Sequence, residues 1–189
     1  MRIVSVRKSL IRWIVSGSAI AAEKNYDRER ALLPEHRVDR IRVYGDPPFV
    51  TDIVEALSQL RHAYPFGHSL VQRYIRAIVQ SSTKPEKSGG IGVVYRKANA
   101  EGRLGVDPNR FAAALVREAI ALRKFTGFYM WRSPRSELLS LKRELRAMEL
   151  LHCERKYFHH VWNEILKRER LIKSQRSKEA NSRGGMGSD

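Results

Sequence analysis

Residues 107–127 read DPNRFAAALVREAIALRKFTG, and this stretch decides the fold. Asp107 and Pro108 form an N-cap and first-turn pair, and Gly127 stands where a C-terminal cap is expected. Between these signals, apolar side chains recur every three or four residues and make a wide apolar face of Phe111, Ala112, Leu115, Val116, Ala119, Ile120 and Leu122. A face this wide has to be covered from several sides. The stretch therefore predicts a helix of about 19 residues at the centre of the protein.

Two shorter helices are predicted before the central one. Asp52 and Glu55 have the spacing of a capping box, which predicts a helix over 52–62. Ser69 and Gln72 repeat that spacing and open a second helix, whose apolar face is Val71, Tyr74, Ile75 and Ile78. We expect these two helices to form a hairpin.

Two more helices are predicted after the central one. Ser133 and Pro134 start a helix whose apolar side chains recur at helical intervals, namely Leu138, Leu141, Leu145 and Met148. The last helix begins near Glu154 and carries on one face Phe158, Val161, Trp162 and Ile165. These faces give both helices a side that can be buried.

Two short segments predict strands. Polar and apolar residues alternate over 40–44, so that Ile41 and Val43 face inward, and 91–95 is the second strand. Pairing of the two gives a ribbon that needs helices packed on it to be stable. The predicted fold class is mainly α: a multi-helix bundle of about five to six helices with a small accessory two-stranded β-ribbon.

The chain divides into three parts. Residues 26–173 are predicted to form a single helical domain, and the polar, Gly-rich residues 174–189 a disordered tail. Residues 1–25 are a basic amphipathic segment, and its first 22 residues contain Arg and Ser but no Asp or Glu. This pattern fits a targeting peptide and also an ordinary first helix. Its apolar run is far shorter than the roughly 20 residues of a spanning helix, so we predict no transmembrane segment.

Charge gives the strongest functional signal. The chain has 36 Lys and Arg against 20 Asp and Glu, a formal net charge of +16. Such a field attracts phosphate backbones, and clustered cations gain affinity by releasing counterions. We predict nucleic acid as the partner, with acidic proteins as a second class. RNA is favoured over DNA because the cations are spread over several helices and no compact recognition-helix motif is visible.

Candidate phosphate contacts lie in the second half of the chain. Arg135, Lys142 and Arg146 follow at offsets of seven and four and therefore share one helix stripe. The full set of predicted nucleic-acid contacts is Arg117, Lys124, Arg135, Lys142, Arg146, Lys156 and Lys167. The alternative is a solvated helix face laced with Glu137, Glu144, Glu149 and Glu164.

Signals for chemistry are weak. Cys153 is the only cysteine, which excludes an intrachain disulfide and a Cys-based zinc knuckle. The default location is therefore intracellular, the mitochondrial matrix in a eukaryote or the cytoplasm in a bacterium. On an unbroken helix Cys153, His160 and Glu164 share a face near His152, but their spacing matches no zinc motif.

The prediction for function is a non-catalytic subunit or accessory factor of a larger assembly that binds nucleic acid, without cofactor or metal. The residues favour this role over an enzyme, because no motif for catalysis rises above background. One alternative is a structural or protein-interaction subunit of an organellar or bacterial complex. A weaker alternative is a histidine-dependent metalloenzyme, in which His62 and His68 would serve as base or ligands.

Overall fold

The computed structural model describes residues 26–28, 30–81, 92–125 and 134–184. The strands within them are β1 Glu35–Val38, β2 Ile41–Tyr44, β3 Ala77–Ser81 and β4 Val93–Lys97. The helices are α2 Pro47–Ala63, α3 Pro65–Tyr74, α4 Pro108–Phe125, α5 Pro134–Leu150 and α6 Arg155–Gly184. The fold is thus mainly α with a small accessory sheet, which confirms the predicted fold class.

The sheet differs from the predicted two-stranded ribbon. Its four strands lie in the order β1-β2-β3-β4, with β1 antiparallel to β2 and both later pairs parallel. The strands predicted to pair with each other are β2 and β4, and β3 lies between them. The helical spacing of Val71, Tyr74, Ile75 and Ile78 predicts a helix that includes Ile78, but Ile78 belongs to β3.

The cause of this error is burial on both sides of a central strand. Ala77, Ile78 and Val79 are all 0% exposed, and Ile78 faces the main core while its two neighbours face a smaller cluster with Tyr26 and Tyr44. A strand covered on both faces has a continuous apolar run, so the two-residue alternation that marks a strand is absent. The helix before it, α3, ends at Tyr74.

The first two helices begin earlier than predicted. The helix α2 starts at Pro47, and α3 starts at Pro65 after a break of a single residue, Tyr64. Proline at the first helical position lacks an N–H that would be unpaired there anyway, and these prolines set the starts in place of the predicted capping boxes. Asp52 consequently lies inside α2, where its buried carboxylate accepts hydrogen bonds from the Arg103 side chain and the Leu104 backbone N–H.

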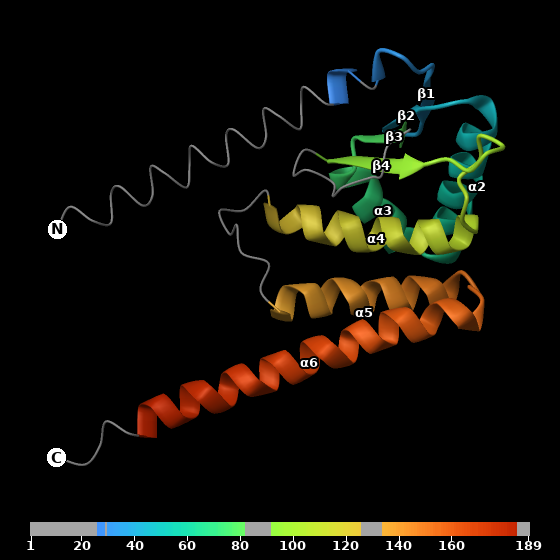
Figure 1. Ribbon diagram of the computed structural model, residues 1–189. Coiled ribbons are helices and arrows are strands. Elements are labelled where there is room, and N and C mark those ends of the chain that lie inside the picture. Colours follow the sequence, from blue (N-terminus) through green and yellow to red (C-terminus); the bar gives the residue numbers. More distant parts are fainter. Residues whose placement is uncertain (1–25, 29, 82–91, 126–133, 185–189) are drawn as a thin grey trace, which may run out of the picture.

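The predicted central helix is α4. It packs against α2 and α3 on one side and against α5 on the other, while α6 packs on the outer side of α5. Figure 1 shows the resulting order: sheet, α4, then the α5–α6 hairpin. The widest apolar face in the sequence therefore lies between the two halves of the protein. Its Phe111, Leu115 and Ala119 are at most 2% exposed.

The helix α6 is longer than predicted. It extends to Gly184, so residues 174–184, predicted to be part of a disordered tail, continue the helix. Lys, Arg, Gln and Ala are good helix formers, and adding a residue to an existing helix avoids the cost of nucleation. The predicted N-terminal segment, residues 1–25, lies outside the described residues. Residues 185–189 lie outside them as well.

A buried carboxylate joins α4 to α5. Glu144, which the alternative interpretation placed on a solvated face, is 0% exposed. One of its oxygens accepts a hydrogen bond from Arg110, and the other lies 3.4 Å from an Arg117 nitrogen. A carboxylate removed from water needs such partners, because the loss of its hydration is otherwise uncompensated.

We therefore expect Glu144→Ala to lower the free energy of unfolding by about 3 kcal/mol, because it leaves two arginines beside a buried void. Urea denaturation monitored by circular dichroism measures this change. The matched control is Glu149→Ala on the same helix, where an exposed pair with Arg146 is removed and stability should hardly change. Equal losses in the two variants would contradict the structural role of Glu144.

Candidate functional site

The predicted stripe on α5 is present at the surface. Arg135, Lys142 and Arg146 are all exposed, and Leu139 lies between them with 46% of its surface accessible. Lys142, however, forms an ion pair with Glu169 of α6 at 3.0 Å, and Arg146 pairs with Glu149 at 3.1 Å. We call Arg135, Leu139, Lys142 and Arg146 the α5 stripe. Of the three cations in the α5 stripe, Arg135 has no acidic partner among the described residues.

Three of the other predicted contacts, Arg117, Lys156 and Lys167, also have acidic partners. Lys156 lies 2.7 Å from Glu154, and Lys167 lies 2.8 Å from Glu164. The hydrogen bond from Lys167 lowers the pKa of Glu164. Arg117 contacts the buried Glu144 and so contributes to the α4–α5 contact. The Lys124 side chain lies outside the described part of the chain.

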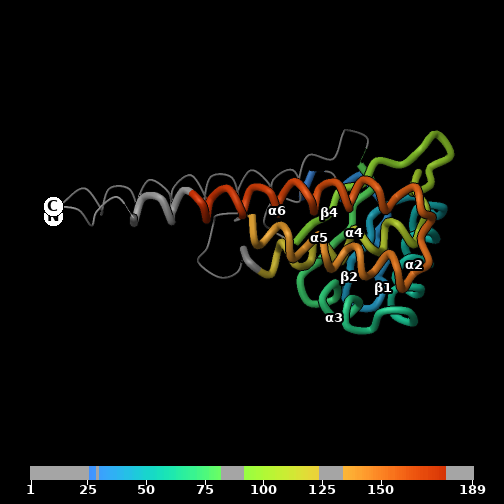
Figure 2. The backbone as a smooth tube through the Cα atoms, turned by 90° about the horizontal axis from the view of Figure 1, so that it is seen from below, coloured from blue at the N-terminus to red at the C-terminus, as the bar shows by residue number. Residues whose placement is uncertain are grey.

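A second basic surface lies on α6, beyond the point where α5 begins. The pair between Arg168 and Glu137 marks the start of α5, and α6 continues past it (Figures 1 and 2). Residues 170–184 contain five Lys and Arg but one Glu. Arg170, Lys173 and Arg176 are exposed, and none has an acidic partner among the residues described. The cationic surplus on the described helices is therefore concentrated on this projecting part.

These cations share a side of α6 with exposed apolar residues. Steps of four, four, three and three residues connect Trp162, Leu166, Arg170, Lys173 and Arg176, and residues at such steps are neighbours on a helix surface. Trp162 is 52% exposed and Leu166 36%. We call this set the α6 stripe. Glu169 lies within it, and its pair with Lys142 places the α6 stripe beside the α5 stripe.

The predicted set of candidate contacts does not include Arg176, because the sequence assigns that residue to a disordered tail. The signal was available in the sequence as the low number of acids after Glu169. Local sequence patterns could not predict that the helix would continue with no other described helix beside it. The sequence pattern places Trp162 on the apolar face of the last helix, but about half of the Trp162 surface is exposed.

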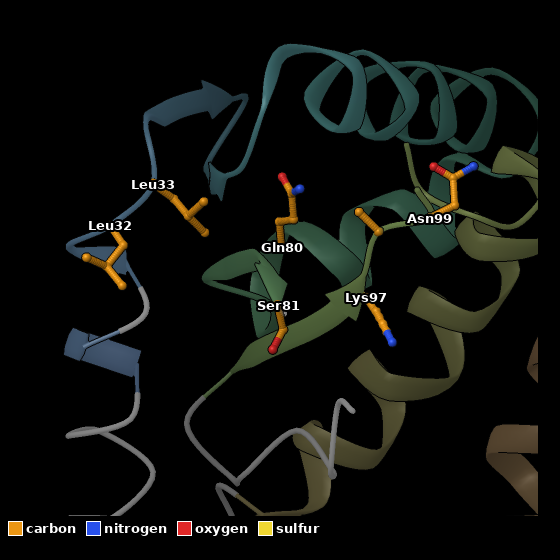
Figure 3. Close-up of a pocket in the computed structure, with 7 residues that line it drawn as sticks. Leu32, Leu33, Gln80, Ser81, Lys97 and Asn99 are labelled. Atoms are coloured by element: carbon orange, nitrogen blue, oxygen red, sulfur yellow. The ribbon is translucent and has the colours of Figure 1, made fainter. Parts of the chain in front are cut away.

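A cleft opens at the carboxyl ends of the parallel strands, the edge where ligands often bind in such sheets. Its volume is about 380 Å³, and its lining includes Leu32, Leu33, Gln80, Ser81, Lys97 and Asn99 (Figure 3). The Gln80 side-chain amide forms two hydrogen bonds with Asp46. The side-chain oxygen of Asn99 accepts hydrogen bonds from two backbone N–H groups. Figure 3 shows Ser81 and Lys97 pointing away from Gln80. The polar groups of this cleft do not converge on one point.

The residues considered for a metal are dispersed. No cluster of three or more His, Cys, Asp or Glu side chains suited to a metal occurs within the described ranges. Cys153 is buried at the turn between α5 and α6, whereas His152 and His160 are exposed, and Glu164 is paired with Lys167. Burial raises the pKa of the Cys153 thiol to about 11, which disfavours the thiolate that a metal or an electrophile requires.

The two histidines of the weaker alternative lie on different elements of the surface. His62 contacts the backbone oxygen of Ser58 one turn earlier in α2, through its Nδ1 atom at 2.7 Å. His68 of α3 contacts Asp39 in the turn between β1 and β2.

Known proteins offer no guide to this arrangement. No family model, curated protein or solved structure matches the chain. None of the described helices combines the length and the apolar character needed to cross a membrane.

The raised pKa and the burial of Cys153 predict slow chemistry at the thiol. At pH 8, native protein should react with a thiol reagent such as Ellman's reagent at least about 100-fold more slowly than protein unfolded in urea. The absorbance of the released thiolate follows both reactions. Comparable rates in the two states would show that Cys153 is accessible and ionised in the folded protein.

Proposed function

We propose that this chain is an intracellular nucleic-acid-binding protein that prefers RNA to DNA and acts as a non-catalytic subunit or accessory factor of a larger assembly. The observation that carries this proposal is the projecting part of α6, where Arg170, Lys173 and Arg176 are exposed without acidic partners among the described residues. Such cations bind phosphates and release the counterions condensed on them. The α6 stripe therefore replaces the paired cations of α5 as the principal contact.

The preference for RNA comes from the aromatic residue at the start of the stripe. Trp162 precedes Arg170 by eight residues, roughly 12 Å along a helix. An exposed indole can stack on a base that is free of a partner, and the nearby cations can hold the phosphates on either side. RNA offers unpaired bases in loops and bulges, whereas the bases of duplex DNA are stacked and paired. Arg135 adds an uncompensated charge next to this surface.

A protein-interaction role is the second candidate. Its support is that Leu139, Trp162 and Leu166 expose apolar surface beside cations that already have acidic partners, such as Lys142 and Lys167. An apolar centre with a charged but compensated rim is the usual composition of a protein interface. A direct measurement of the affinity for RNA distinguishes this role from RNA binding.

Reversal of the three free charges should weaken RNA binding strongly. We expect the triple variant R170E/K173E/R176E to flatten the dependence of log affinity on log salt by about two units, since each lost single-strand phosphate contact removes about 0.7. Fluorescence anisotropy of a labelled, unstructured RNA over a range of salt concentrations measures the slope.

The matched control reverses three paired charges, in the variant K142E/R146E/K167E. It changes the net charge by the same amount but should reduce the slope less, because these cations are already compensated. Equal effects of both variants would mean that only the total charge matters. Absence of RNA binding by the unchanged protein would refute the proposed function.

Removal of the indole should act on single strands selectively. We expect Trp162→Ala to weaken binding to the unstructured RNA by about tenfold, the value of one stacked base, and to leave binding to a duplex of equal length nearly unchanged. Trp162 fluorescence should be quenched by the single strand in a variant in which the other tryptophans are replaced by Phe. A parallel loss for single strand and duplex would contradict base stacking.

A further inference from the structure

A separate polar hollow lies at the opposite edge of the sheet from the cleft of Figure 3. It opens between the β1–β2 turn and α3, near the start of β2. Its volume is about 730 Å³, a size that accommodates a small-molecule ligand. The residues that line it, which we call the Asp39 hollow, are Asp39, Arg40, His68, Ser69, Gln72 and Arg73.

The one carboxylate in the hollow is occupied by the protein's own groups. Asp39 Oδ2 lies 3.2 Å from His68 Nε2 and accepts a hydrogen bond from the Gln72 amide, also at 3.2 Å. The other oxygen lies 3.7 Å from an Arg61 nitrogen. These contacts offset the negative charge that would otherwise repel an anion. The Asp39 backbone lies in the left-handed region, at φ 52°, in the turn between β1 and β2.

Two arginines in the hollow are available to a ligand. Arg40 and Arg73 are exposed, and neither has an acidic partner within the described part of the chain. Gln72 holds the elements that carry them together, because its Oε1 accepts the Arg40 backbone N–H at 2.9 Å and Arg73 is the next residue of α3. The guanidinium of Arg73 also lies over the Tyr74 ring, at 5.6 Å. Both cations are therefore attached to backbone that is already fixed.

We propose that the Asp39 hollow binds a small phosphorylated ligand through its phosphoryl group. The planar guanidinium presents paired N–H donors that match two phosphate oxygens, and two such groups line this site. Ser69, which carries a hydroxyl donor, also lines the hollow. Gln72 is a positioning residue, since it acts through Arg40 and Asp39. The site is distinct from the α6 stripe and is independent of the proposed RNA binding.

Titration calorimetry of the full-length protein with inorganic pyrophosphate, at constant ionic strength set by sodium chloride, tests the proposal. We expect saturable binding with one ligand per chain, a loss of about tenfold or more for Arg40→Ala and for Arg73→Ala, and an intermediate loss for Gln72→Ala. Arg40→Lys should recover only part of the affinity, because an ammonium group lacks the paired donors.

The matched control is Arg37→Ala, an exposed arginine on β1 of the same hairpin that does not line the hollow. It should bind pyrophosphate as the unchanged protein does. Non-saturable heat, or equal losses in the Arg37, Arg40 and Arg73 variants, would overturn the proposal. Unchanged thermal melting verifies that each variant is folded. The Arg40 and Arg73 variants should keep full RNA affinity, so this site and the α6 stripe fail or succeed separately.

Discussion

The whole arrangement depends on a carboxylate buried between two long helices. Glu144 of α5 lies in the core against Arg110 and Arg117 of α4, and α5 in turn carries α6. An ion removed from water needs partners at fixed positions, so this contact favours one side and one register at which the α5–α6 hairpin meets the body. The surface that the hairpin leaves exposed, with Trp162 and Leu139, follows from that register.

The same packing explains where positive charge is left over. Where α5 and α6 lie side by side, cations of one helix pair with carboxylates of the other: Lys142 pairs with Glu169, and Arg168 pairs with Glu137. Past the start of α5, no described helix accompanies α6, and the acids in its own sequence are few. A high net charge thus becomes a local field on the projecting part of the helix, where a polyanion can reach it.

The two arginine surfaces differ in how they are built. The cations of the α6 stripe stand on a single exposed helix and are spaced along its length, which suits an extended polyanion. Arg40 and Arg73 come from a turn and a helix that Gln72 joins, and they line a concave site, which suits a compact ligand. The chemistry of the side chains is the same, and the backbone beneath them decides the class of partner.

The sequence by itself determined the helices whose signals are local. Pro108 and the apolar spacing after Asp107 were sufficient to predict α4, and the offsets of Arg135, Lys142 and Arg146 placed them on one stripe of α5. Only the tertiary structure decided that Ile78 belongs to a parallel strand, that Glu144 is buried against Arg117, and that Trp162 is exposed. The physical reason is range: helix periodicity and capping act within a few residues, whereas strand order, burial and ion pairing depend on segments brought together from distant parts of the chain.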